Sequence, residues 1–325
     1  MLVTLHDFEL TLDSDSARIE AEWAQLYAPF VAHPTQGEGD GGIPIRLNLT
    51  LASTMPAPPA GRPAYAQSDL AVYPTGDHLI IHLPRLGQLE VNPAAGAVDG
   101  VLVPEALDLY GAFEDINAVG LAPLLRRHGR VLIHAFAAAY QGEGLLLVGD
   151  SASGKTTTGL ALLAAGWKLI ANDSPMLGEQ DGQVTAYAYP GLIGTHADTL
   201  RRIPALRELV DDPTLAPPRP DWKTSLAAEE HFASPWQERA PVKAICLLNL
   251  DPDAAPLEHQ LAALSPAAAL GQLLPHSVDR WDQEAVGSHI DLLQALVQQA
   301  PAYRLALGTD IAALPRLLES LVGGA

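Results

Sequence analysis

Residues 142–173 read GEGLLLVGDSASGKTTTGLALLAAGWKLIAND, and this stretch decides the fold class. Residues 145–148 form a short apolar run, which is typical of a buried strand. Residues 157–165 carry leucines among alanines, which favour a helix, and Gly166 stands where the glycine that ends a helix belongs. Residues 167–171 predict a second strand. The order strand, loop, helix and strand predicts an α/β (mixed) fold.

The loop between the first strand and the helix, residues 149–156, reads GDSASGKT and fits the phosphate-binding (Walker A) pattern G-x-x-x-x-G-K-[ST]. Gly149 and Gly154 let the backbone turn so that successive N–H groups face one concavity at a helix N-terminus. Aligned donors and the helix dipole favour an anion there. We therefore predict phosphate contacts from nine consecutive residues: Gly149, Asp150, Ser151, Ala152, Ser153, Gly154, Lys155, Thr156 and Thr157.

Three side chains in and after this loop suit a nucleotide and its metal ion. Lys155 would meet the outer phosphates as a point charge. The Thr156 hydroxyl and the Asp173 carboxylate, at the end of the second strand, are hard oxygen ligands for a Mg²⁺ ion that also holds phosphates. ATP and Mg²⁺ are therefore the predicted ligands. The alternative is a glycine-rich turn that binds nothing, although this motif matches by chance only on the order of one per cent of the time.

Composition and charge exclude several classes of protein. A chain of 325 residues corresponds to one large or two modest domains. With 48% hydrophobic and 18% charged residues, it can build a sizeable core and is not globally disordered. A net charge of −19 argues against a general nucleic-acid or anionic membrane surface. A polyphosphate must therefore be bound by local groups, namely the glycine-rich loop, Lys155 and a metal ion. Lysine is scarce, since the only lysines are Lys155, Lys168, Lys223 and Lys243.

The single cysteine, Cys246, lies inside the apolar run 244–248, which predicts a buried structural residue rather than a reactive one. The N-terminus lacks a basic segment followed by a long apolar core, so we expect no signal peptide. No apolar run reaches the ~18 residues that a membrane-spanning helix needs. We expect a soluble, cytoplasmic protein.

Residues 1–110 predict a β-rich N-terminal domain. Strands are expected at 1–12, 43–51, 69–73, 78–84 and 87–92, a helix at 17–30, and loops at 33–42 and 56–63. His78 and His82 fall on one strand face. Because no third ligand stands near them in sequence, a surface or pocket-edge role is favoured over a metal site.

Residues 111–325 predict a nucleotide-binding domain of mixed elements. Helices are expected at 104–129 (entering from the preceding domain), 194–210, 265–274, 280–300 and 311–322. Strands are expected at 131–133, 136–140, 184–189, 242–250, 258–264 and 303–307, with a turn at 178–182. The segment 131–148 predicts an antiparallel pair that leads into the glycine-rich loop.

Four basic residues after the predicted phosphate loop are candidates to cover the phosphates or to bind an anionic substrate. They are Arg201, Arg202, Arg219 and Lys223. In a strongly acidic chain such cations are scarce, which makes each of them notable. The alternative for any one of them is a solvated surface charge.

Three segments together resemble the HPr kinase/phosphorylase superfamily, which shares a nucleotide-binding core with phosphoenolpyruvate carboxykinases. They are Ile133-His134, the run from Gly144 to Thr156, and the run from Gly166 to Asp173. The shared features are a histidine shortly before the loop, a Gly-x-Ser start to the loop, and a strand that ends at the position of an acidic pair. The segment 301–305, PAYRL, resembles the family's last strand. The likeness covers about residues 120–190, is looser over 240–322, and does not extend to 1–110.

The resemblance implies roles for individual residues. Lys155 would hold the outer phosphates, Thr156 the magnesium ion, and Asp173 would activate the acceptor hydroxyl, while His134 matches the family histidine beside the loop. The resemblance also implies a homo-oligomer and a P-loop core of the HPr kinase/phosphoenolpyruvate carboxykinase type. The catalytic residues predicted in this way are Asp173, Lys155 and His134.

The sequence departs from the family pattern at several positions. Asn172 stands where the first acid of the pair is found, Ala152 where the bifunctional kinases usually have glycine, and Thr157 where they usually have glutamate. The Arg-Gly signature that those enzymes use around HPr is not found after Asp173. These departures argue against HPr as the acceptor and against a phosphorylase activity.

The leading hypothesis is an ATP-dependent kinase that acts on a hydroxyl, either a seryl side chain of a protein or peptide, or a small molecule. The alternative, motivated by Asn172, is a nucleotide-binding regulatory or scaffold protein without turnover. A ligase or carboxykinase is a third interpretation, although no cluster of His, Lys and Asp metal ligands is seen for it. The sequence does not identify the acceptor.

Overall fold

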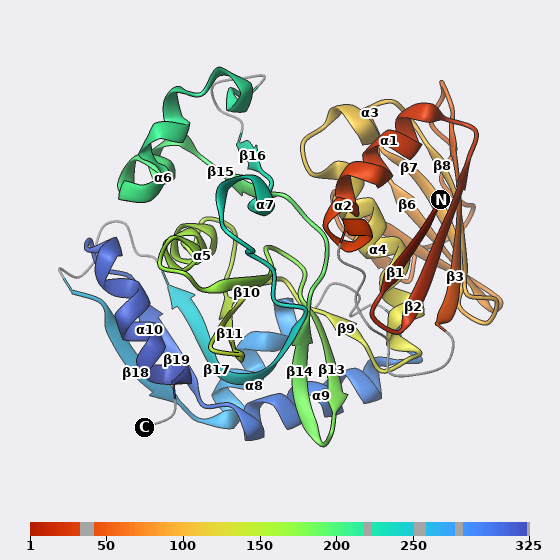
Figure 1. The fold of residues 1–325 in the computed structure, drawn as a ribbon. Coiled ribbons are helices and arrows are strands. Elements are labelled where there is room, and N and C mark those ends of the chain that lie inside the picture. Colours follow the sequence, from red (N-terminus) through yellow and green to blue (C-terminus); the bar gives the residue numbers. More distant parts are fainter. Residues whose placement is uncertain (33–41, 218–222, 250–257, 277–281, 324–325) are drawn as a thin grey trace. The chain divides into compact units, whose positions relative to one another are not determined.

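The computed structural model describes residues 1–32, 42–217, 223–249, 258–276 and 282–323 (Figure 1). The fold is mixed α/β with several sheets, as predicted. Two compact units are present: Met1–Arg130 with the described residues of Val278–Val286, and Val131–Ser277 with Gly287–Ala325. The predicted loop at 33–42 (except residue 42) and Arg219 lie outside the described residues.

The first unit contains an eight-stranded sheet. Its strands are β1 (Leu2–Leu5), β2 (Phe8–Ser14), β3 (Ile43–Leu51), β4 (Tyr65–Ala66), β5 (Ala71–Thr75), β6 (His78–Leu83), β7 (Gly87–Asn92) and β8 (Ala97–Leu102). Their order is β1-β2-β3-β8-β7-β6-β5-β4, with β2, β3 and β8 parallel and the other pairs antiparallel. Buried and exposed residues alternate along β2, β3, β7 and β8, so one face of the sheet is covered and the other is exposed to solvent.

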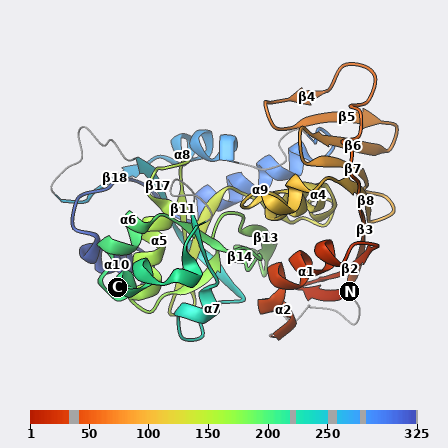
Figure 2. The ribbon, with the colours of Figure 1, turned by 90° about the horizontal axis from the view of Figure 1, so that it is seen from above.

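Helices cover the buried face of this sheet. They are α1 (Ala17–Leu26), α2 (Ala28–Ala32), α3 (Glu105–Asp108) and α4 (Ala112–Arg126). The helix α1 packs on β2 and β3, and α4 packs on β7 and β8; Figure 2 shows both on the same side of the sheet. Trp23 and Tyr27 are fully buried with their ring centroids 4.3 Å apart. Large aromatic side chains of this kind dominate the burial energy of a small core.

Local backbone geometry explains two differences from the sequence prediction in this unit. The predicted strand 1–12 is a hairpin, because His6 adopts a positive φ of 54° and turns the chain between β1 and β2. The predicted helix 104–129 is two helices, separated at Gly111 with a φ of 71°. The strand β8 was not predicted, and its Gly100 and Asp99 weaken the strand signal there.

The sequence predicts a domain boundary after residue 110, whereas the first compact unit extends to Arg130. The helix α4 accounts for the difference, since it belongs to the core of the first unit. A Cβ added to Gly120, in the middle of α4, would lie 3.0 Å from Leu89 Cδ1 and 3.6 Å from Val98 Cγ1. This close approach of helix to sheet ties α4 to β7 and β8.

The second unit is built around β11 (Glu143–Val148). Its central sheet runs in the order β12 (Lys168–Ala171), β10 (Ala135–Tyr140), β11, β17 (Arg239–Asn249), β19 (Ala302–Ala306) and β18 (Gln260–Leu264). The strands β11, β17 and β19 are parallel, whereas β10, β12 and β18 are antiparallel to their neighbours. The predicted antiparallel pair that leads into the loop is therefore confirmed as β10 and β11.

The strand β17 also belongs to a second group of strands. Its first residues pair with β14 (Gln183–Tyr187), which pairs with β13 (Met176–Gln180) and through it with β9 (Val131–Leu132). The strand β13 runs to Gln180, so the predicted turn at 178–182 is shortened to Asp181 and Gly182, both with positive φ. This arrangement brings the end of β9 beside β13, and the segment that precedes β10 therefore lies next to residues 173–175.

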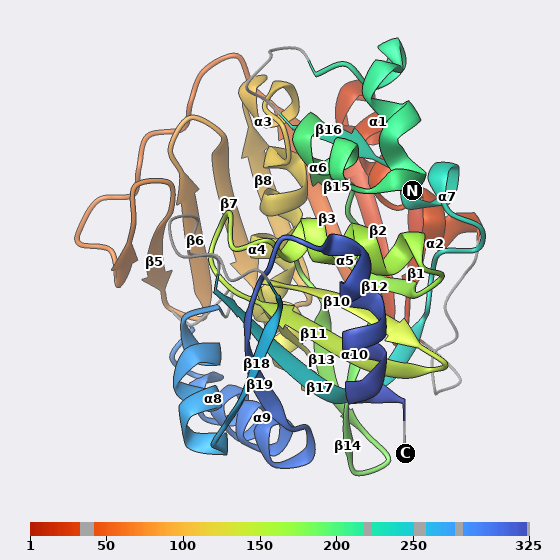
Figure 3. The same cartoon turned by 90° about the vertical axis from the view of Figure 1, so that its left-hand side faces the viewer.

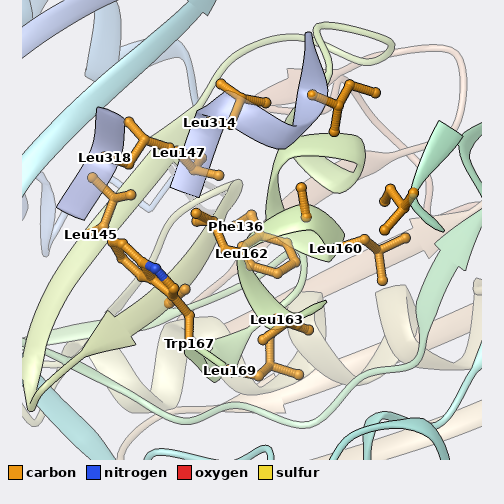
Figure 4. Close-up of a cluster of buried hydrophobic side chains, with 14 of the residues drawn as sticks. Phe136, Leu145, Leu147, Leu160, Leu162, Leu163, Trp167, Leu169, Leu314 and Leu318 are labelled. Carbon is orange, nitrogen blue, oxygen red and sulfur yellow. The ribbon is translucent and has the colours of Figure 1, made fainter. Parts of the chain in front are cut away.

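Alternate residues of β11 contribute to two separate hydrophobic cores. Leu145 and Leu147 face a core shared with α5 (Lys155–Ala164) and α10 (Leu314–Val322), drawn in Figure 4. Leu146 and Val148 face a core shared with α8 (Pro266–Leu273) and α9 (Val286–Gln299). Figure 3 shows α10 and the pair α8 and α9 on different sides of the central sheet. A strand buried on both faces reads as the continuous apolar run seen in the sequence.

The remaining elements of this unit lie between β14 and β17, directly after α8, and directly before α10 in the sequence. They are β15 (Ile193–Thr195), α6 (Ala197–Arg202), the 3₁₀ helices Pro204–Asp211 and Pro213–Leu215, β16 (Thr224–Leu226), α7 (Ala228–His231), and the 3₁₀ helices Leu274–His276 and Ile311–Ala313. The predicted helix 194–210 is therefore a short strand and two helices, because Pro204 interrupts the helical hydrogen bonds. The predicted start of a helix at 280 falls partly outside the described residues, and α9 begins at Val286.

We predict that Gly159, in the middle of α5, cannot be replaced by alanine without loss of stability. A Cβ there would lie 2.4–2.6 Å from three ring atoms of Phe136, which is fully buried. Gly159→Ala should lower the free energy of unfolding by about 1–3 kcal/mol through overpacking, despite a gain in helix propensity. The matched control is Gly271→Ala in α8, where no atom lies within 4 Å and a small gain is expected. Urea denaturation compares them, and a Gly159→Ala variant as stable as wild type would contradict this packing.

A second prediction concerns the thiol of Cys246, which is fully buried in β17 as the sequence indicated. Burial raises its pKa to about 12, and the thiolate is the reactive form. The native protein should therefore not react with Ellman's reagent at pH 8, whereas the denatured protein should release one equivalent of thionitrobenzoate. Reaction of the native protein at the rate of free cysteine would show that β17 is not buried in this way.

Candidate functional site

The glycine-rich loop 149–156 lies at the carboxyl ends of three parallel strands. It runs from the end of β11 to the start of α5, and the side chain of Leu307, just after β19, packs against it. Gly154 has a φ of +96°, and a Cβ on it would lie 2.4 Å from Leu307 Cδ1. Ala152 has a φ of +64°, an uncommon conformation for a residue with a side chain. Ligands of open α/β sheets bind at such strand ends.

Position 149 needs a glycine because a side chain would have no room there, and not because of its backbone φ angle. A Cβ on Gly149 would lie 2.6 Å from Ser153 Oγ and 3.0 Å from the carbonyl oxygen of Leu248. The loop therefore turns back on itself directly against β17. The Ser153 Oγ is buried and has no hydrogen-bond partner in the protein. Both glycines of the motif are thus explained by the way the loop is folded.

Lys155 is buried and is held by the loop itself. Its Nζ donates hydrogen bonds to the carbonyl oxygens of Gly149 at 2.6 Å and Asp150 at 3.0 Å. Burial lowers the pKa of Lys155, the charges of Asp173 and Asp150 raise it, and the charge of Lys223 lowers it. The ammonium group is therefore fixed at the loop, where an anion would gain most from it.

His134, Asp173 and Lys155 are close enough for their charges to act on one another. The backbone N–H of Ala135 donates to the carbonyl oxygen of Asp173 at 3.1 Å, which fixes the two segments together. Burial lowers the pKa of His134, and the charge of Lys155 lowers it further, while Asp173 raises it. The lowered pKa favours the neutral imidazole of His134. Asp173 itself is exposed and accessible to a ligand.

A second histidine, His276, belongs to the same group and was not singled out in the sequence. Its carbonyl oxygen accepts a hydrogen bond from the backbone N–H of His134 at 2.5 Å, and the two rings stack with centroids 6.4 Å apart. The positive form of His276 lowers the pKa of His134. Sequence reasoning could not find His276, because it is 142 positions away from His134 and matches no local motif.

Asn172 occupies a polar position behind Asp173. Its Nδ2 donates to the carbonyl oxygen of Leu192 at 3.0 Å and to Asp173 Oδ2 at 3.3 Å. Its Oδ1 is buried and has no hydrogen-bond partner in the protein. Asn172 thus connects the end of β12 to the start of β15 and orients the carboxylate of Asp173.

The oxygen and nitrogen groups at this loop fit a nucleotide with magnesium. Among the described residues no group of three or more His, Cys, Asp or Glu side chains could hold a metal ion by itself. Magnesium does not need such a cage, since it usually keeps waters and binds one or two protein oxygens together with phosphates. The half-buried Thr156 and the exposed Asp173 are the predicted ligands, and their binding of magnesium stays a prediction.

The other predicted basic residues have different surroundings. Arg201 pairs with Asp198 at 2.5 Å on the exposed side of α6, which is the surface role given as the alternative. Arg202 is exposed. Lys223 is the exception, because its charge acts on Lys155. Of the three candidates among the described residues, Lys223 is therefore the one for which the structure gives a link to the loop.

The helix α6 lies beside the first turn of α5 and borders a cavity. The hydroxyl groups of Thr157 and Thr199 are 3.1 Å apart and join the two helices. A cavity of about 340 Å³ lies beyond this contact, and its polar lining includes His196, Asp198 and Thr224. This volume is in the range of small-molecule sites.

Comparison with known proteins gives no match in sequence and a distant likeness in structure. No protein-family model matches the chain, and no curated protein matches it significantly. Among solved structures, the HPr(Ser) kinase/phosphatase from Coxiella burnetii is similar over 58% of this chain and 92% of its own, at 15% identity and a TM-score of 0.32. A TM-score this low does not establish a shared fold. Among the described residues, no helix is both long enough and apolar enough to cross a bilayer.

We predict that an acid at position 172 destabilises the protein when no metal is bound. In Asn172→Asp a second carboxylate would face the Leu192 carbonyl and the Asp173 carboxylate in a buried position. The free energy of unfolding should fall by about 1–3 kcal/mol in a chelating buffer. Magnesium should recover part of this loss, because it neutralises the acidic pair.

The matched control is Asn172→Ala, which removes the same hydrogen bonds without adding charge. Denaturation of wild type and both variants, with chelator and with magnesium, separates the two effects. Stability of Asn172→Asp equal to that of wild type in chelator would contradict the hydrogen bonding described for Asn172.

Proposed function

We propose that this chain is an ATP-dependent kinase that transfers the γ-phosphoryl group to a hydroxyl of a seryl side chain or of a small molecule. The observation that supports this most is the grouping of Lys155, Asp173 and His134 beside the glycine-rich loop. The unit of Val131–Ser277 with Gly287–Ala325 contains all three. The resemblance of the loop and its flanks to HPr kinases points to the same chemistry.

Each group has a role in the proposed transfer. The loop N–H groups and Lys155 hold the phosphates of ATP. The acceptor oxygen attacks the γ-phosphorus, the bond from that phosphorus to the β,γ-bridging oxygen breaks, and ADP leaves with the electron pair. The acceptor proton passes to the Asp173 carboxylate, which Asn172 orients. Magnesium, bound through Thr156 and Asp173, would supply charge neutralisation of the phosphates.

His134 is suited to position the acceptor rather than to neutralise phosphate charge. Burial and Lys155 lower the pKa of His134 and so favour the neutral imidazole, in which one ring nitrogen can accept a hydrogen bond from a hydroxyl. Its backbone is fixed by hydrogen bonding to His276. Phosphoryl transfer depends mainly on positioning and electrostatics, so a fixed acceptor contact of this kind contributes directly.

One observation favours a second function, a nucleotide-binding regulatory protein without turnover. Asn172 replaces an acid that related enzymes carry, and in this chain it is built into the structure by two hydrogen bonds. A binder would retain the loop and Lys155 and would not need a second carboxylate. In either case the net charge of −19 argues against nucleic-acid partners, and a cytoplasmic location and a homo-oligomer stay predictions.

We predict that Asp173→Asn removes turnover and keeps nucleotide binding. The amide cannot accept the acceptor proton, so phosphoryl transfer or ATP hydrolysis should fall by at least 100-fold, a loss in the range of general-base catalysis. The dissociation constant for ATP should change only a few-fold. Transfer of ³²P from [γ-³²P]ATP to candidate peptides and metabolites, or its release as phosphate when water is the acceptor, measures turnover, and calorimetry measures the dissociation constant.

The control variant is Asp291→Asn, an exposed aspartate on α9 away from the loop, which should behave as wild type. If wild type binds ATP and shows no turnover with any acceptor or water, the regulatory alternative is favoured. If Asp173→Asn turns over as fast as wild type, Asp173 is not the base.

A further inference from the structure

The strands β15 and β16 form a two-stranded ribbon beside the glycine-rich loop. Residue Leu192, immediately before β15, accepts a hydrogen bond from Asn172, which places the start of the ribbon next to Asp173. The strand β15 then packs against α5. At its far end Thr195 pairs with Thr224 of β16, and both are buried. The ribbon is therefore fixed at both ends, and one of these ends is joined to the site.

Lys223 directly precedes Thr224 and is carried by this ribbon. Because Thr224 pairs with Thr195, Lys223 lies about 10 Å along β15 from Leu192, at the end of the ribbon from which the chain enters α6. The ribbon is further tied to the loop helix through α6, where Thr199 meets Thr157 at 3.1 Å. The positive charge of Lys223 lowers the pKa of Lys155. Lysine is also scarce, since the chain has only four.

We propose that Lys223 is a second cationic ligand for the outer phosphates of a nucleoside triphosphate bound at the loop. This inference rests on the proposed function, since it deepens the same site. Lys155 approaches the phosphates from the loop, whereas Lys223 approaches them from the β15–β16 ribbon. The two ammonium groups flank the γ-phosphoryl group and share the negative charge that moves onto the leaving oxygen during transfer.

The charges around Lys155 support this role. Two carboxylates, Asp150 and Asp173, act on Lys155 together with Lys223. Without Lys223, Lys155 would be the one ammonium group beside two carboxylates, and a bound polyphosphate would depend on its magnesium ion for the rest of its charge compensation. Two ammonium groups near each other repel, and a bound anion between them converts this repulsion into attraction. The strongly acidic remainder of the chain cannot supply this compensation.

The four lysines allow a direct test on the unmodified protein. An ATP analogue whose γ-phosphate carries a desthiobiotin acyl group transfers that group to lysines near the phosphates. The lysine amine attacks the acyl carbon, the bond from that carbon to the phosphate oxygen breaks, and ATP leaves. We expect labelling of Lys155 and Lys223, suppressed by free ATP, and background labelling of Lys168 and Lys243. Lys168 donates to the carbonyl oxygens of Ala233 and Ser234, and Lys243 pairs with Glu143.

The outcomes separate this inference from the proposed function. ATP-sensitive labelling of Lys155 with Lys223 at background would overturn the role of Lys223 and leave the nucleotide site intact. Background labelling of all four lysines, or labelling that free ATP does not suppress, would contradict both the role of Lys223 and the proposed nucleotide site. Peptide mass spectrometry after proteolysis assigns each site.

Variants add a second readout. Lys223→Ala should weaken ATP and ADP binding about ten-fold, the usual effect of losing a hydrogen bond to a charged group, and leave AMP binding unchanged. Lys223→Arg should restore most of the affinity, and the matched control Lys243→Ala should bind as wild type. Equal loss for ATP and AMP would show that Lys223 has a structural role only.

Discussion

The turn from β11 into α5 is the constraint on which the rest of the second unit depends. The loop must leave a strand that is buried on both faces, pass against β17, and enter a helix that packs on Phe136. A Cβ at Gly149, Gly154 or Gly159 would lie only 2.4–2.6 Å from a neighbouring side-chain atom. The three glycines lie within eleven residues, so one segment determines both the packing of α5 on the sheet and the shape of the loop. The position of Lys155 follows, since its ammonium group is bonded to the carbonyl oxygens of that same loop.

Local patterns in the sequence predicted this part of the fold well. The apolar run 145–148, the glycine-rich loop and the leucine–alanine helix each carry a short-range signal, and β11 and α5 lie where these signals placed them. Short-range signals also found Cys246 in a buried strand. The hairpin at His6 and the break at Gly111 were missed because they depend on single positive φ values. The assignment of α4 to the first unit was missed because it depends on contacts with Leu89 and Val98.

In the candidate site, too, residues of a local motif could be predicted, whereas residues from distant segments could not. Lys155, Thr156 and Asp173 could be named from one motif and the strand that follows it. The contributions of His276 and of the β15–β16 ribbon could not, because they come from segments far away in sequence and are placed by β pairing and by backbone hydrogen bonds. Asn172 is an intermediate case. Its departure from an acidic pair was visible in sequence, whereas its structural role as a donor to Leu192 and Asp173 was not.

We propose that the loop 149–156 is a working nucleotide site with Lys155 as its main cation. Calorimetric titration of the wild-type chain and of Lys155→Ala with magnesium and ATP, and in parallel with GTP, tests it most directly. We expect saturable binding of one nucleotide by the wild type and a loss of at least 100-fold in the variant, with both proteins equally folded by circular dichroism. Equal binding by the two proteins, or no binding by the wild type, would contradict it.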